Sequence, residues 1–149
     1  GMISQGSLDW TDYRVEADVT PWMAAAAGVA ARVQGLRRYY ALLLTSEGRA
    51  RVVRANDDVT VLADVAFDVE NFRTYALALE VIGPRIKAWV DGVTLADVVD
   101  ESPRSLHGGA VGLVCEEGTM GSYEVRVAPV ATSFDGGTPE RTELEEARS

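Results

Sequence analysis

The stretch from Thr74 to Val114 constrains the fold of this chain more than any other part of the sequence. Apolar residues alternate with polar ones in two successive runs, which are separated by the turn Gly83-Pro84. A second turn, Asp91-Gly92, is typical of a two-residue hairpin, because a type I′ turn needs positive φ at both central positions. The stretch therefore predicts a series of antiparallel strands.

The same alternation recurs in the rest of the chain. From Tyr13 to Val19 the odd-numbered residues are apolar and the even-numbered residues are charged. Turn residues separate such runs at the spacing found in all-β sandwiches and barrels. There is no alternation of strand and helix patterns, which argues against a parallel α/β fold. The prediction is an all-β chain folded as an antiparallel β-sandwich.

Composition excludes several classes of function. The 149 residues suit one domain with a real hydrophobic core. The net charge of −9 disfavours general binding to nucleic acid or to an anionic membrane. No apolar run approaches the roughly 18 residues that span a bilayer. A single cysteine, Cys115, rules out an internal disulfide and is expected to be a small buried hydrophobic residue.

Three segments are expected along the chain. Residues 1–7 are interpreted as an expression-derived start and lead-in, and residues 8–130 as the β-sandwich domain. Residues 131–149 are interpreted as an acidic tail or linker, in which Thr138 and Pro139 could begin a short helix. This tail is consistent with a longer parent chain. No signal peptide is recognised, so a stand-alone protein would be expected in the cytoplasm.

Two patterns together resemble the concanavalin A-like lectin and glucanase superfamily. One is Trp10–Val19 followed by Ala27–Arg32, and the other is Arg85–Gly92 followed by Gly109–Leu113. The resemblance is to the bacterial laminin-G-like and glycosidase-associated domains in particular. It implies a jelly roll of two curved sheets, with an oligo- or polysaccharide as the usual ligand on the concave face. It implies no single activity, because this fold hosts lectins, hydrolases and interaction domains.

An enzymatic role has limited support. The glucanases of this superfamily carry a Glu-x-Asp-x-Glu strand, which places carboxylates about 6.6–6.8 Å apart along one face. Glu16 and Asp18 match the first two acids, but Thr20 stands in the third position. This departure argues against catalysis. A glycoside hydrolase that uses Glu16 and Asp18 is therefore the alternative hypothesis.

A binding role is the first hypothesis, in the form of a non-catalytic carbohydrate-binding accessory domain. Sugar sites combine an aromatic platform with polar groups that orient hydroxyls. Trp89 lies off the core face by its alternation with apolar neighbours, and either Tyr39 or Tyr40 must leave the core. The candidate ligand residues are Arg32, Tyr40 and Trp89. A structural interaction domain is the third hypothesis, and homo-oligomerisation is left open.

No cofactor is predicted. Calcium is the one metal considered, because lectins of the superfamily bind it through Asp and Asn oxygens. The run Asn56-Asp57-Asp58 falls short of the six to eight oxygen ligands that calcium takes, so a polar turn is the preferred interpretation. Motifs of serine hydrolases, zinc proteases and Cys/His metal sites do not occur in the sequence.

Overall fold

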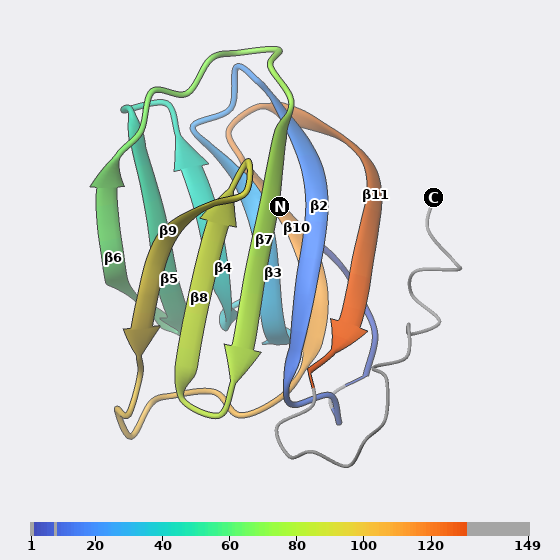
Figure 1. The fold of residues 1–149 in the computed structure, drawn as a ribbon, viewed down its shortest axis with the longest axis vertical. Coiled ribbons are helices and arrows are strands. Elements are labelled where there is room, and N and C mark those ends of the chain that lie inside the picture. The colour runs from blue at the N-terminus through green and yellow to red at the C-terminus, as the bar shows by residue number, and fades with distance from the viewer. Residues whose placement is uncertain (1, 8, 131–149) are drawn as a thin grey trace.

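The structure, a computed structural model, describes residues 2–7 and 9–130 of the chain. These residues form two antiparallel sheets packed face to face (Figure 1). Sheet A has six strands in the order β1-β10-β3-β4-β5-β6, and sheet B has five in the order β11-β2-β7-β8-β9. The strands are β1 (Met2–Gln5), β2 (Tyr13–Trp22), β3 (Ala26–Gly35), β4 (Arg38–Thr45), β5 (Arg49–Asn56), β6 (Asp58–Ala66), β7 (Tyr75–Ile82), β8 (Arg85–Val90), β9 (Val93–Val99), β10 (Ala110–Glu116) and β11 (Thr119–Pro129). The predicted all-β, antiparallel β-sandwich is confirmed.

The hairpin between β8 and β9 forms where the sequence predicts it. Asp91 and Gly92 have φ values of 51° and 80°, as a type I′ turn requires. Val90 and Val93 are paired on either side of the turn. The hairpin therefore follows from local turn chemistry.

The N-terminal boundary differs from the expectation. Met2–Gln5, which the sequence places in the lead-in, forms β1 and pairs with β10 from Met2↔Val114 to Gln5↔Val111. A four-residue strand is too short to show a periodic pattern, so only its partner in the folded chain identifies it. The tail 131–149, with the helix expected at Thr138, lies outside the described residues. Within the described part of the chain, no helix is long and apolar enough to cross a membrane.

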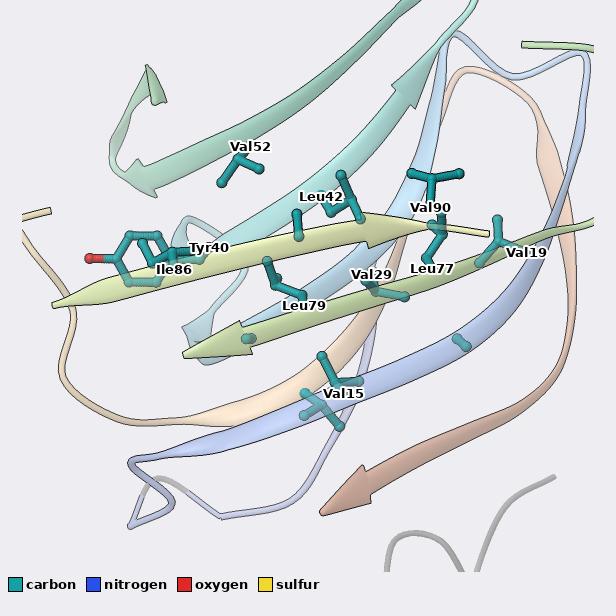
Figure 2. Close-up of a cluster of buried hydrophobic side chains, with 14 of the residues drawn as sticks. Val15, Val19, Val29, Tyr40, Leu42, Val52, Leu77, Leu79, Ile86 and Val90 are labelled. Carbon is teal, nitrogen blue, oxygen red and sulfur yellow. The ribbon is translucent and has the colours of Figure 1, made fainter. Parts of the chain in front are cut away.

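The main core lies between the two sheets. Figure 2 shows side chains of β2, β7 and β8, such as Val15 and Leu79, on one side, and side chains of β3, β4 and β5, such as Val29 and Leu42, on the other. These four residues have no exposed surface. They come from the alternating positions of each strand, so the period-2 pattern directly supplies one buried face per sheet.

A second apolar cluster lies on the outer face of sheet A. Its members alternate with the main-core residues and are mostly small: Ala26, Ala30, Val33, Ala41, Leu43, Val53, Ala110 and Val114. Met2 and Tyr39 pack against them. Gly28 belongs to the same region, and a Cβ there would overlap the carbonyl oxygen of Leu42. The centre of this outer face is thus small and apolar, whereas the outer face of sheet B carries charged side chains.

Candidate functional site

The three ligand residues selected from the sequence do not share one surface. Arg32 and Tyr40 lie inside the sandwich, and each is 1% exposed. Trp89 is half-buried on the outer face of sheet B, which confirms that it lies off the core. Of the tyrosine pair, it is Tyr39 and not Tyr40 that leaves the core.

Arg32 is turned inward by an irregularity in β3. Its φ is +50°, and the register with β4 shifts between Ala31 and Gly35. The guanidinium donates hydrogen bonds to the carbonyls of Thr11 (3.0 Å), Gly83 (2.6 Å) and Leu106 (3.0 Å). It also donates to the Asp12 carboxylate at 3.1 Å. Burial lowers the pKa of Arg32, and the charge of Asp12 opposes this.

Tyr40 belongs to a buried polar group at the same end of the sandwich. Its hydroxyl donates to Asp100 Oδ2 at 2.6 Å and accepts from the backbone N–H of Leu106 at 3.0 Å. Arg54 donates to the other oxygen of Asp100 at 2.7 Å. Burial raises the pKa of Tyr40, and its hydrogen bond to Asp100 adds to this. Burial alone would raise the pKa of Asp100, but the hydrogen bonds from Tyr40 and Arg54 lower it overall. Arg32 and Tyr40 therefore hold loops together.

Trp89 and Glu16 are both engaged by cations on the outer face of sheet B. The Arg14 guanidinium carbon lies 4.4 Å from the Trp89 ring centroid, and Lys87 Nζ lies 5.6 Å from it. Glu16 accepts from Arg14 at 2.7 Å and pairs with Arg126 at 3.4 Å. The aromatic face that a sugar would need is thus occupied by Arg14.

The third position of the Glu16 strand, Thr20, is engaged with a neighbouring threonine. Glu16 and Asp18 occupy alternate positions of β2, paired with Ala78 and Ala76 of β7. The Thr20 hydroxyl is hydrogen-bonded to that of Thr74 at 2.7 Å. The hydrolase that uses Glu16 and Asp18 stays a prediction.

A different set of polar residues converges on the outer face of sheet A. Arg51 of β5 stands directly opposite Asp64 of β6, and Arg49 stands opposite Thr45 of β4. Arg49 Nε donates to Asp64 Oδ1 at 2.8 Å, and Arg51 Nε lies 3.4 Å from Asp64 Oδ2. Arg51 also pairs with Glu47 at 3.7 Å. We call Thr45, Arg49, Arg51 and Asp64 the polar row.

Two atoms of the polar row are buried without a hydrogen-bond partner. They are Thr45 Oγ1 and Arg51 Nε, whose approach to Asp64 satisfies the distance of an ion pair but not the geometry of a hydrogen bond. Thr45 as a whole is only 5% exposed. Both atoms have almost no exposed surface, so they are exceptions to the usual pairing of buried polar atoms and are not open to a ligand.

The charges around the polar row are balanced once Glu47 is included, because Arg49 and Arg51 face the carboxylates of Asp64 and Glu47. The hydrogen bond from Arg49 lowers the pKa of Asp64, and the charges of Arg49 and Arg51 act in the same direction. On the same outer face, burial raises the pKa of Tyr39, and the negative charge of Glu116 adds to this. The row therefore presents hydrogen-bonding groups without a strong net charge.

The described residues contain no cluster of side chains suited to bind a metal ion. Among the described residues, no group of three or more His, Cys, Asp or Glu side chains is arranged to hold a metal ion. In the turn considered for calcium, the Asn56 amide donates to the carbonyl of Arg104 at 3.0 Å. Asp57 pairs with Arg38 at 3.7 Å.

Comparison with known proteins places the fold. No family model matches the chain, and no curated protein matches it either. Among solved structures, it is similar to the carbohydrate-binding module CBM66 of Bacillus subtilis, with a TM-score of 0.64, 19% identity and 74% of each chain covered. The galectin LEC-6 of Caenorhabditis elegans gives a TM-score of 0.61 at 17% identity, covering 85% of this chain and 89% of the galectin. This chain has a concanavalin A-like lectin fold.

A third solved structure is similar over most of the chain. It is domain 4 of AbnA, an extracellular arabinanase of Geobacillus stearothermophilus, which was solved with arabinotriose. The TM-score is 0.61 at 12% identity, with 85% of this chain and 65% of that chain covered. At such identities the likeness shows the fold alone, which confirms the resemblance seen in the sequence.

Sequence reasoning missed the polar row of this lectin fold. A local signal existed, because Arg49 and Arg51 are two residues apart on one strand and must share a face. Asp64 lies on a different strand, opposite Arg51, after a register shift between Val52 and Val53. No spacing along the chain shows that pairing.

Proposed function

We propose that this chain is a non-catalytic carbohydrate-binding domain whose ligand contacts the polar row on the outer face of sheet A. The observation that carries the proposal is the partly exposed Arg49–Asp64–Arg51 array, which combines hydrogen-bond donors and an acceptor on one face. Two similar folds support it, since CBM66 is a carbohydrate-binding module and the AbnA domain was solved with arabinotriose.

The chemistry of the polar row suits neutral sugar hydroxyls. A hydroxyl both donates and accepts hydrogen bonds. Asp64 supplies acceptor oxygens, while the guanidiniums of Arg49 and Arg51 supply donors in a fixed plane. The small apolar residues beside the row, together with Tyr39, offer a surface for the C–H face of a sugar ring. The balanced charge favours a neutral ligand over an acidic one.

The same geometry argues against Asp64 as the general acid of a glycosidase. A glycosidase needs one carboxylic acid that is protonated at the working pH. The hydrogen bond from Arg49 lowers the pKa of Asp64, so this carboxylate remains ionised at neutral pH. A fixed, ionised acceptor is useful for binding but cannot protonate a leaving group.

An accessory role in a longer bacterial protein completes the proposal. CBM66 comes from a bacterium, and the AbnA domain is one domain of a bacterial arabinanase. The test is to sequence the gene in its source genome. A catalytic domain for polysaccharides encoded in the same reading frame would support the accessory role, and a reading frame confined to this domain would contradict it.

Binding is tested by a glycan array followed by calorimetry on the glycans that bind. In Arg51→Ala, loss of a charged hydrogen-bond donor should weaken binding by about 1.5 kcal/mol or more, which is about ten-fold. The matched control is Arg85→Ala. Arg85 forms an exposed pair with Asp97 at 2.7 Å on the opposite sheet and should leave binding unchanged.

The control separates the site from general electrostatics. The side chains of Arg51 and Arg85 are 30% and 53% exposed, so each substitution should alter the free energy of unfolding by less than about 1 kcal/mol. Equal effects of the two variants on affinity would remove the polar row from the proposal. Absence of binding to any glycan on the array would contradict the function itself.

A further inference from the structure

Large apolar side chains are exposed where loops gather at one end of the sandwich. Trp22 is 43% exposed, Met23 69% and Phe72 68%. Trp22 and Met23 lie at the turn from β2 to β3, and Phe72 lies in the loop from β6 to β7. We call these three residues the loop platform. Exposed apolar residues held together in this way need an explanation other than packing.

The backbone of the loop platform is held in an unfavourable conformation. Met23 and Phe72 have φ values of 57° and 66°, a region that bulky residues rarely adopt. Two cross-loop hydrogen bonds maintain it. Met23 N–H donates to Asn71 Oδ1 at 3.0 Å, and Phe72 N–H donates to the Pro21 carbonyl at 2.8 Å. Strain that the surroundings enforce is typical of binding sites.

The Trp22 ring lies against Gly121 and has polar neighbours. An added Cβ at Gly121 of β11 would lie 3.1 Å from Trp22 Cζ2, so the indole rests on a position without a side chain. Two residues before it, Thr20 shares a hydrogen bond with Thr74. An aromatic ring beside hydroxyl groups is the combination that a sugar ring requires.

The loop platform is joined to the polar row by hydrogen bonds between loops. Figure 1 shows the β2–β3, β4–β5 and β6–β7 connections at the same end of the sandwich. Ser46 N–H donates to the Ala25 carbonyl at 2.9 Å, and Phe67 N–H donates to the Gly48 carbonyl at 2.9 Å. The β4–β5 turn that these bonds anchor lies between Thr45 and Arg49 of the polar row. The two surfaces therefore belong to one rigid end of the molecule.

We propose that the loop platform is a second contact surface for the carbohydrate chain held by the polar row, with sugar rings stacked on Trp22 and Phe72. This inference rests on the proposed function. Trp22 lies against β11 of sheet B, and packed sheets are about 10 Å apart, so a monosaccharide on the outer face of sheet A does not reach the platform. The ligand class is accordingly an oligo- or polysaccharide of several linked rings.

The size of the loop platform favours a sugar over a protein. A stable protein interface buries about 800 Å² per partner around an apolar centre. Here the three apolar side chains have two polar neighbours, Asn71, which accepts from the Met23 N–H, and Thr74, which is hydrogen-bonded to Thr20. A stacked sugar ring needs only an aromatic face and adjacent hydrogen-bonding groups.

The test compares affinities for mono- to hexasaccharides of a glycan that binds. The affinity of the wild type should rise about ten-fold with chain length. Once one end of the glycan is bound at the polar row, its other rings are at a high effective concentration near the platform. The double variant Trp22→Ala, Phe72→Ala should lose this gain and keep the monosaccharide affinity. Val93→Ala removes another exposed apolar side chain at the β8–β9 turn and is the matched control.

A glycine substitution separates binding from folding. Phe72→Gly removes the ring and also relieves the positive φ, so we expect loss of the chain-length gain with an unfolding temperature at or above that of the wild type. Asp57→Gly relieves a φ of 68° in the β5–β6 turn and should leave the gain intact. A Phe72 ring that serves only for packing would instead lower the unfolding temperature when removed.

Other outcomes identify which proposal fails. If the wild type binds no glycan, the proposed function and this inference both fall. If it binds, but the double variant keeps the full gain with chain length, only the loop platform is refuted. If the double variant changes the oligomeric state in solution and not the affinity, the platform is an interface between copies of the chain, which also overturns the inference.

Discussion

The Tyr40 hydroxyl provides a sharp test of how this sandwich is held together. It donates to Asp100 Oδ2 and accepts from the N–H of Leu106, both inside the protein. Tyr40→Phe deletes one oxygen and leaves two buried polar groups with one partner fewer. Each such group costs about 1–3 kcal/mol, and Asp100 keeps its hydrogen bond from Arg54, so we expect a loss of about 2–4 kcal/mol in the free energy of unfolding.

This loss is large enough to measure by thermal and urea denaturation. Unfolding entropy of about 2.1 cal/mol/K per residue converts it to a fall of about 7–15 °C in the unfolding temperature for a domain of this size. Tyr39→Phe is the control, since it removes the same atom from a half-buried ring on the outer face. That change should stay below about 0.5 kcal/mol.

The same pair of variants tests the role that the sequence suggested for Tyr40. If Tyr40→Phe leaves stability within about 0.5 kcal/mol of the wild type, the reasoning from buried hydrogen bonds is refuted. If it also weakens glycan binding more than Arg51→Ala does, Tyr40 is a ligand residue after all. Loss of stability with unchanged affinity in the folded protein would support the structural role.

Three further predictions follow from the fold. The hydrogen bonds of Asp100 lower its pKa, so its stabilisation is present above the unfolded-state value of about 3.9 and is lost as pH falls through the folded-state value. In the wild type the urea concentration at the unfolding midpoint should fall between pH 5 and 2, and Asp100→Asn should make this fall smaller. An unchanged fall would contradict the prediction. Gly109→Ala should destabilise the protein by more than about 2 kcal/mol, because the φ of Gly109 is +147° and a Cβ would lie 2.5 Å from the Arg32 backbone. Gly35 has open space around it, so Gly35→Ala should be nearly neutral by comparison. We expect the wild type to release reducing sugar from glycans only at background level, and Glu16→Gln to leave this level unchanged. Release by the wild type that disappears in Glu16→Gln would establish the hydrolase.

Most of the fold could be predicted from local patterns. The alternation from Tyr13 to Val19 becomes a strand with its odd-numbered residues in the core. The Asp91-Gly92 turn forms with the expected positive φ values. Each feature depends on a few neighbouring residues, so the information lies within one stretch of the chain.

The candidate site could not be predicted in the same way. Alternation correctly placed Trp89 outside the core, but it does not show that Arg14 covers the ring. Arg32 sits at an irregularity of β3, where alternation no longer tells inside from outside. Asp64 reaches Arg49 and Arg51 only because β5 and β6 pair in one particular register. Register and bulges are properties of strand pairs, so no single segment contains them.

Alternation and turn residues are enough to predict an antiparallel sandwich from the sequence, because both act within one stretch of the chain. The order of the strands and the face of each sheet that is open to a ligand depend on the folded structure. That structure placed Tyr40 in the core and Tyr39 outside, and it brought Arg51 to Asp64 from different strands. Burial depends on what packs against a side chain, and that is settled only when distant strands meet.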